Sequence, residues 1–388
     1  MIVLKQSTCF MFIYLCMTFV VAVRLDGVVV RLPSTLLVIP LFFTTKIIFP
    51  RRAGFIFIVF IAFTLAHYLI IEATGIGMFS FKYVLKDYIL YVGVFGIYLF
   101  LVHPLNWSDT NNFAHKFFKV IVVISLGLYL LSMLGGIDIG IDNSHTPVRV
   151  SGVMTEPANL AHFLPAFVVY SFCRRHWIWL CASFTLLILT FSPTVLGTLT
   201  GTILLFYLIK YPKIRVVFLV LFLIFVIYLF FADYASYRNY LSDKGLVGFV
   251  GIRIVDGIQY IVTGGELGYN SRALLYFDGI DIIKKHGLLY TGAGFASSIV
   301  LADLYNGGML YDSTTFFSIF IWFGMLPLFA YFFIQWKLIK YYSSDFLSML
   351  LLSLCVSNFI TGGGVWIQMF FWSLLWMKYR SMKQEIVV

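Results

Sequence analysis

Long apolar runs recur along most of this chain, and they constrain its fold more than any other feature. Of its 388 residues, 61% are hydrophobic and only 11% are charged. A soluble protein of this size would need more charged side chains to cover its surface. Runs of about 16 to 24 apolar residues are long enough to cross the hydrocarbon layer as helices. The sequence therefore predicts an all-α, polytopic integral membrane protein.

About twelve apolar runs are expected to be transmembrane helices. They are residues 8–23, 34–49, 53–73, 86–105, 117–137, 157–173, 177–192, 194–209, 215–232, 312–335, 346–360 and 365–377. The first run resembles a signal peptide, but Arg24 and Asp26 follow it and no small-residue cleavage pattern precedes them. We therefore interpret it as an uncleaved span.

The positions of Lys and Arg orient these spans. With the N-terminus inside, every inner turn is basic, as is typical of membrane proteins. The inner cations are Arg51, Arg52, Lys116, Lys119, Arg174, Arg175, Lys210, Lys213, Arg215, Lys337, Lys340, Lys378, Arg380 and Lys383. Both termini are then expected in the cytoplasm. This topology accounts for much of the net charge of +10, so we expect the lipid bilayer, and no nucleic acid, as a partner.

Three regions follow from this topology. Residues 1–232 hold spans one to nine and an outer segment at 137–157, residues 233–311 form a large outer loop with short helices, and residues 312–388 hold the last three spans and a cytoplasmic tail. The outer loop carries the cations Arg238, Lys244, Arg253, Arg272, Lys284 and Lys285. Cations are unusual on the outer side of a membrane, so they indicate that an anionic ligand is handled there.

No metal, cofactor or disulfide is expected. The five cysteines fall in or beside apolar runs, and none lies in the large outer loop. The acidic pairs at Asp138 and Asp142 and at Asp278 and Asp281 are not expected to complete a site for a hard cation.

The outer segment before the sixth expected span holds the first candidate residues. Arg149 and Glu156 flank a turn that contains Gly152, and Pro157 suits the first position of the following helix. A cap and an ion pair between Arg149 and Glu156 would explain these residues structurally, and a catalytic role for Glu156 is the alternative. His162 lies on the same helix and is expected near a cavity.

The large outer loop holds the second set. Residues 270–287 predict an amphipathic helix that begins near Arg272 and stops at a glycine. A guanidinium at a helix start can hold a phosphate or diphosphate together with backbone N–H groups, although an ordinary surface Arg is the alternative. Gly292 and Gly294 then form a turn that permits close backbone approach. Arg253 is a further cation of this loop.

These two segments resemble those of the bacterial O-antigen polymerase (Wzy) and O-antigen ligase superfamily. The first match comprises Arg149, Gly152, Glu156, Pro157, Asn159 and Ala161. The second is an Arg followed about twenty residues later by a Gly-x-Gly turn, here Arg272 and Gly292 to Gly294. The family often has Pro where this chain has Gly287. The His that ligases carry before the next span is absent, and Asp312 stands in that region, which resembles the polymerase branch.

The resemblance implies a metal-independent glycosyltransferase at the periplasmic face of the bacterial inner membrane. Its substrates would be oligosaccharide repeat units on undecaprenyl diphosphate, and a chain-length regulator and a flippase are implied partners. Arg149, Arg253 and Arg272 would bind the diphosphate, and Arg272 would also be catalytic. Glu156, His286 and Asp312 are the candidates for the base. A ligase or other glycan transferase, and a flippase or other transporter of such lipids, remain alternatives.

Overall fold

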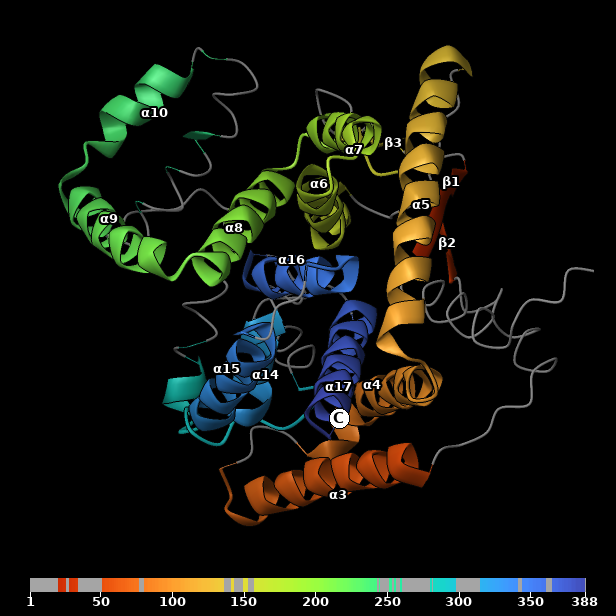
Figure 1. Cartoon of the computed structure of the whole chain (residues 1–388). Helices are drawn as coiled ribbons and strands as arrows, with labels where there is room; N and C mark the ends of the chain where they lie inside the picture. The colour runs from red at the N-terminus through yellow and green to blue at the C-terminus, as the bar shows by residue number, and fades with distance from the viewer. Residues whose placement is uncertain are drawn as a thin grey trace, which may run out of the picture. The chain divides into compact units, whose positions relative to one another are not determined.

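The computed structural model describes residues 20–25, 28–33, 51–76, 80–135, 141–142, 149–152, 157–242, 244, 251–252, 255, 259, 280, 282–297, 315–340, 344–360 and 365–387 (Figure 1). The chain divides into two compact units, which we describe separately. Unit 1 comprises Met1–Ile203 and Leu288–Val388, and unit 2 comprises Leu204–Gly287.

The prediction of a mostly helical chain is confirmed, and its apolar helices support the prediction that it is embedded in a membrane. Among the described residues, three helices are long and apolar enough to cross a membrane: α3 (Arg51–Ala73), α4 (Phe81–Val102) and α5 (Trp107–Gly135). The other helices that lie in unit 1 or begin there are α6 (Leu164–Cys173), α7 (Trp177–Leu189), α8 (Pro193–Lys210), α14 (Thr315–Phe323), α15 (Met325–Lys340), α16 (Phe346–Ile360) and α17 (Val365–Val387). Each expected span from residue 53 onward thus corresponds to one of these helices, to α9 (Pro212–Phe231), or to a pair of helices.

The N-terminal region departs from the expected helices. Strands β1 (Val20–Leu25) and β2 (Val28–Pro33) form an antiparallel hairpin in which Leu25 pairs with Val28. The prediction of a helix is therefore wrong at the end of the first expected span, 8–23, which forms a strand from Val20 onward. Both strands are rich in β-branched valine, which favours strands, and Asp-Gly between them is a strong hairpin signal. The second expected span, 34–49, lies outside the described residues.

Two other expected spans are helical but interrupted. The run 157–173 begins as the 3₁₀ helix η1 (Pro157–His162) and becomes α6 only at Leu164. The run 312–335 contains two helices, α14 and α15, which meet at Gly324 with a φ of +80°. A left-handed glycine ends the helical path of the backbone, so the chain changes direction there.

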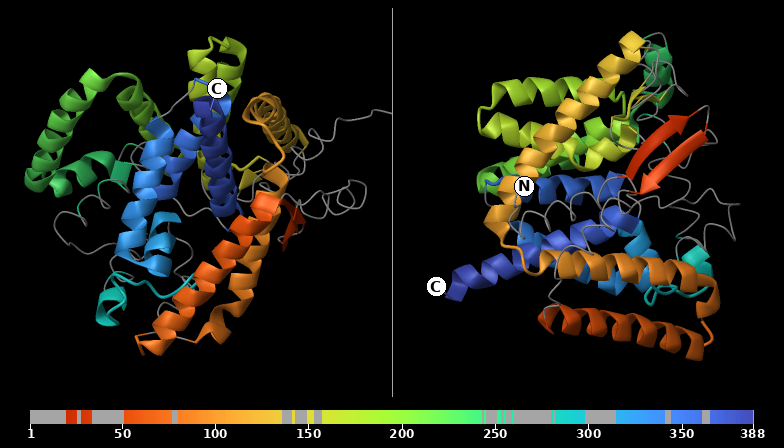
Figure 2. Two further views of the ribbon diagram at one scale, coloured as in Figure 1. Left: turned by 60° about the horizontal axis from the view of Figure 1, so that its bottom comes forward. Right: turned by 90° about the vertical axis from the view of Figure 1, so that its right-hand side faces the viewer.

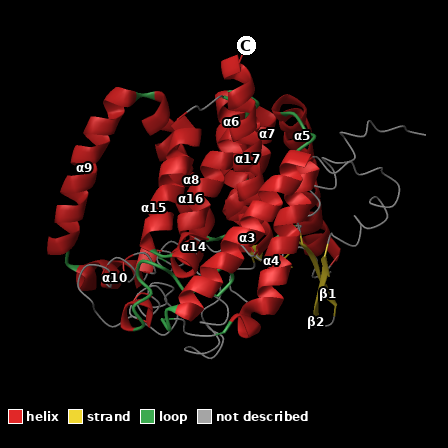
Figure 3. Ribbon diagram, turned by 90° about the horizontal axis from the view of Figure 1, so that it is seen from below, coloured by secondary structure: helices red, strands yellow, loops and turns green. Residues whose placement is uncertain are grey.

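Helix α16 is the centre of unit 1. It packs against η1, α5, α6, α14, α15 and α17, and α17 in turn packs along α4. Figure 1 shows α16 between α6 and α17, and the two further views in Figure 2 show the strands of the hairpin at the margin of this unit. Helices α3 and α4 run side by side in Figure 3.

Unit 2 continues from the end of α8 through α9 (Pro212–Phe231) and α10 (Tyr234–Ser242). Asp233 caps α10, because its carboxylate accepts hydrogen bonds from the Ser236 hydroxyl at 2.8 Å and the Ser236 amide at 3.2 Å. These bonds, led by the one from the Ser236 hydroxyl, lower the pKa of Asp233. A helical turn at Ile282–Lys285 ends at Gly287, whose φ is +71°.

Candidate functional site

The segment Leu288–Ser297, here called the docked segment, lies on the break between α14 and α15. The amides of Ala293 and Gly294 donate to the carbonyls of Ile321 at 2.7 Å and Trp322 at 3.0 Å, and the amide of Met325 donates to Leu289 O at 2.9 Å. In an unbroken helix the Met325 amide would donate to Ile321 O. The docked segment therefore supplies both partners that the break removes.

Three glycines allow this approach of one backbone to another. A Cβ at Gly292, where φ is +70°, would lie 2.5 Å from backbone atoms of Trp322 and Phe323. One at Gly324 would lie 2.3 Å from the carbonyl of Tyr290, and one at Gly294 would lie 2.2 Å from the ring of Tyr68. Real Cβ atoms do not approach neighbours so closely, so the docked segment fits only with glycine at these positions.

Helix α3 holds the other side of the docked segment. His67 Nε2 lies 2.7 Å from Thr291 O, so Nε2 carries the proton and donates it. The hydroxyl of Tyr68 donates to the carbonyl of Phe295. Both bonds join α3 to backbone more than 220 residues later. These hydrogen bonds supply donors to two carbonyl groups that take part in no helix or strand. Irregular backbone among apolar helices is stable only when its polar groups have such partners.

The side chain of Phe295 anchors the docked segment in an aromatic cluster. It is fully buried, and its ring centroid lies 4.9 Å from that of Trp322 on α14. The ring centroids of Phe60 on α3 and Tyr91 on α4 lie 5.3 Å and 5.6 Å from that of Phe295. The cluster therefore has aromatic rings on three sides. Edge-to-face rings at these separations attract one another beyond their apolar burial. Phe295 thus joins α3, α4 and α14.

The first outer segment forms a short hairpin. Strand β3 (Ile141–Asp142) pairs with β4 (Arg149–Val150), and Asp142 is the register partner of Arg149. Arg149 is half-buried, whereas Val150 is fully buried. Gly152 follows with a φ of +60°, and a Cβ there would lie 2.4 Å from the Ser125 hydroxyl on α5. This hairpin therefore turns directly over α5.

His162, the last residue of η1, is fully buried against α16. Its Nδ1 lies 2.8 Å from the hydroxyl of Ser357, and that hydroxyl donates to Leu354 O at 3.1 Å. Because Ser357 uses its proton on Leu354, His162 Nδ1–H is the donor and Nε2 is unprotonated. Nε2 is buried and has no hydrogen-bond partner within the described part of the chain.

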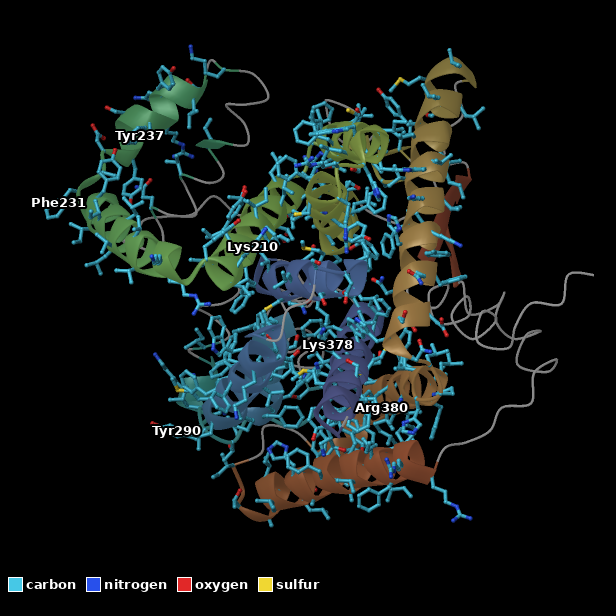
Figure 4. The ribbon with its side chains drawn as sticks, in the orientation of Figure 1. Lys210, Phe231, Tyr237, Tyr290, Lys378 and Arg380 are labelled. Atoms are coloured by element: carbon cyan, nitrogen blue, oxygen red, sulfur yellow. The ribbon has the colours of Figure 1, made fainter. Side chains whose placement is uncertain are left out.

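Helix α17 contacts a neighbour of each segment. Phe370 lies 6.2 Å from Phe163, next to His162, and Trp372 lies 6.5 Å from Trp322 in the cluster of Phe295. Phe370 and Trp372 belong to the first part of α17, whereas Lys378 and Arg380 lie toward its other end (Figure 4). The ring contacts of Phe370 and Trp372 therefore lie in the part of α17 away from those cations.

The predicted site residues are only partly covered by the structure. Glu156, Arg253, Arg272 and Asp312 lie outside the described residues. Arg149, Gly152, Pro157, Gly292 and Gly294 lie in unit 1, and His286 lies in unit 2. No group of three or more His, Cys, Asp or Glu residues among the described residues could hold a metal ion. What the described residues build is a scaffold in which the first outer segment packs on α5 and α16, and the docked segment packs on α3, α14 and α15.

Sequence reasoning missed the residues that hold these segments. His67 and Tyr68 lie inside an expected span, Gly324 lies inside another, and Ser357 lies on a third. A polar side chain within an apolar run costs free energy in the bilayer unless it has a partner. His67 carried that signal, but only the structure identifies its partner.

No protein-family model, no curated protein and no solved structure matches this chain.

Proposed function

We propose that this chain is an O-antigen polymerase, a glycosyltransferase that joins undecaprenyl-diphosphate-linked repeat units at the periplasmic face of a bacterial inner membrane. The observation that carries the proposal is that residues beside the two family-like segments pack on one helix, α17. Phe163, beside His162, packs on Phe370 of α17, and the aromatic cluster of Phe295 packs on Trp372 of the same helix. Residues next to each of the two segments, which are far apart in sequence, thus contact one helix, as a site built from both segments would require.

The proposed reaction transfers the growing glycan from its lipid diphosphate to the terminal hydroxyl of a second unit. The hydroxyl oxygen attacks the anomeric carbon, the bond to the diphosphate oxygen breaks, and the hydroxyl proton passes to a base. Undecaprenyl diphosphate departs with the bonding electrons. Arg149, Arg253 and Arg272 are proposed to stabilise this departing charge, and Glu156, His286 or Asp312 to take the proton.

The proposed topology has both termini in the cytoplasm and about twelve spans. Basic residues support it, because Arg52 lies in the first turn of α3 and Arg380 lies toward the end of α17, away from the docked segment. That end is proposed as the cytoplasmic one. A chain-length regulator and a flippase are proposed partners of the polymerase.

A transporter of the same lipid-linked sugars is the second candidate, and the break at Gly324 favours it. Discontinuous helices with inserted irregular backbone are typical of transporter binding sites. In this chain, however, the amides of Ala293, Gly294 and Met325 all have backbone partners at the break. They offer no free donors to a substrate there.

Deletion of the gene in its host distinguishes the candidates. The surface lipid of the deletion strain, resolved on a gel, should carry a single repeat unit if the chain is the polymerase. Loss of all repeats would indicate a ligase, and accumulation of unexported units would indicate a flippase. Complementation with the Arg272→Ala variant should give normal membrane insertion but no glycan ladder, because truncation of one such contact costs the transition state about 2 to 4 kcal/mol.

A further inference from the structure

Two histidines lie side by side where α5 meets the turn between α6 and α7. His115 lies in the first half of α5, and His176 directly precedes α7. Their ring centroids are 5.9 Å apart, and their ring planes differ by 21°. Both side chains are half-buried. Helix α5 therefore packs on α7 (Figure 1) beside a contact between two groups that can bind protons.

The surroundings of this histidine pair are mostly aromatic. The ring centroid of Tyr170 on α6 lies 4.9 Å from that of His115 and 6.4 Å from that of His176. The rings of Phe167 on α6 and Phe346 on α16 lie 5.9 Å and 5.8 Å from His115. Packed rings screen charge less than water does, so charges placed on the pair interact strongly.

Cations flank the pair. Lys119 follows His115 by one turn of α5, and its ammonium group lies 5.0 Å from the ring of Trp179 on α7. The guanidinium group of Arg174, at the end of α6, lies 5.8 Å from the ring of Tyr170. A positive charge on either imidazole therefore meets charges of the same sign.

No carboxylate balances these charges within the described residues. Asp345 lies at the start of α16, and its carboxylate accepts hydrogen bonds from Trp107 Nε1 at 2.9 Å and from the Ser348 amide at 2.7 Å. Neither imidazole forms an ion pair in the described part of the chain. There, His115 Nε2 and His176 Nδ1 are buried and have no hydrogen-bond partner.

We propose that the contact between His115 and His176 is acid-sensitive, so that protonation of both imidazoles releases the α6–α7 turn from α5. Two positive charges at this separation repel each other, and partial burial weakens the screening by water and salt. Lys119 and Arg174 add to the repulsion. The separated helices therefore bind protons more readily than the packed helices. The contact is complete at neutral pH and is lost as the pH falls below about 6.5, where an ordinary imidazole gains its proton.

Release of this contact affects the support of the first outer segment. Helix α5 carries Ser125 against Gly152 of that segment, and α6 continues from η1, which ends at His162. The first outer segment is thus flanked by the helices that the histidine pair joins. In the proposed topology the pair lies toward the cytoplasm, so cytoplasmic acid would loosen this support. The device needs only the packing of these helices and no glycan transfer.

Hydrogen–deuterium exchange of the purified full-length chain in detergent tests this device. After correction for the intrinsic effect of pH on amide exchange, exchange at residues 170–180 should rise at least about tenfold between about pH 7.5 and about pH 5. The docked segment should keep its exchange over this range. His115→Gln and His176→Gln should each suppress the rise. Lys116→Gln, which removes an exposed charge from α5, is the matched control and should retain it.

The melting temperature at neutral pH shows whether each variant folds, and the wild-type exchange decides alone if a variant does not. Equal exchange of the wild-type α6–α7 turn at the two pH values would overturn the proposal. So would a rise in either histidine variant as large as that of the wild-type chain. An equal rise in the docked segment would show general unfolding by acid and would also overturn it.

Discussion

Gly292 and Trp322 meet backbone to backbone, at a distance that leaves no room for a side chain on Gly292. A Cβ there would lie 2.5 Å from the carbonyl carbon and oxygen of Trp322. The Trp322 carbonyl cannot rotate away, because it accepts a hydrogen bond from the Gly294 amide at 3.0 Å. This crossing fixes the docked segment on the break between α14 and α15.

Gly292→Ala should therefore destabilise the protein strongly. The substitution adds a backbone clash and places alanine at a φ of +70°, which together should lower the free energy of unfolding by at least about 2 kcal/mol. Titration of the purified protein with a denaturing detergent measures this change. Gly93→Ala on α4 is the control, because a Cβ there meets nothing within 4 Å. Equal stability of the two variants would contradict the crossing.

Tyr68→Phe should remove the hydroxyl that donates to Phe295 O. The carbonyl then stays buried without this donor, which should cost about 1 to 3 kcal/mol of unfolding free energy. Tyr83→Phe on α4 is the control, since Tyr83 is 67% exposed and should change stability little. The same detergent titration compares them. A Tyr68→Phe protein as stable as the control would show that α3 does not hold the docked segment through this bond.

Phe295→Ala should leave a cavity among Phe60, Tyr91 and Trp322. Removal of a fully buried phenylalanine costs about 3 to 5 kcal/mol. Phe329→Ala on α15 should cost much less, because Phe329 is 57% exposed. Proteolysis of the folded variants offers a second readout, with new cleavage expected near the docked segment only in Phe295→Ala. Identical cleavage patterns would count against its role as anchor.

The helices of this fold were predictable because an apolar run is a local property of the sequence. The break at Gly324 was not, because its compensation is distant. The amide of Met325 bonds to Leu289, thirty-six positions earlier in the chain, and Phe-Gly-Met reads locally as helix. The hairpin β1–β2 was missed for another reason. Its valines suit an apolar helix and a strand equally in a hydropathy profile, although their β-branching favours the strand.

The candidate site was predictable only in part, because its glycines and histidines are visible in the sequence and their distant partners are not. Gly292 and Gly294 indicate a place where another group comes close. The sequence does not identify these groups, which are the backbone of Trp322 and the ring of Tyr68. His162 is polar in an apolar context, yet its partner Ser357 is 195 residues away. The roles of Arg272, Glu156 and Asp312 stay predictions.

Ser357→Ala should destabilise the packing of η1 on α16. His162 Nδ1–H would lose its acceptor at 2.8 Å in a fully buried place, at a cost of about 1 to 3 kcal/mol. Thr200→Ala is the matched control, because the exposed Thr200 hydroxyl donates to Leu196 O of its own helix. Equal unfolding free energies for the two variants would rule out the His162–Ser357 bond as a stabilising contact.

His103 should make stability depend on pH. Burial, then Arg380 and Arg52, lower its pKa below the ordinary value of 6.5. The unfolded state then binds the proton more readily than the folded state, so stability is full above that value and falls as the pH drops below it. His103→Gln should reduce the fall in melting temperature between neutral and mildly acidic pH. A variant with an unchanged pH profile would contradict this assignment.

The most direct test of the proposed function is reconstitution of the purified chain in liposomes with undecaprenyl-diphosphate-linked repeat units from its host. The proposal predicts products of two and more repeats, with release of undecaprenyl diphosphate and no requirement for a nucleotide sugar or a metal ion. Arg272→Ala, shown to be folded by its melting temperature, should give none. A folded wild-type chain that leaves the units at a single repeat would contradict the proposal.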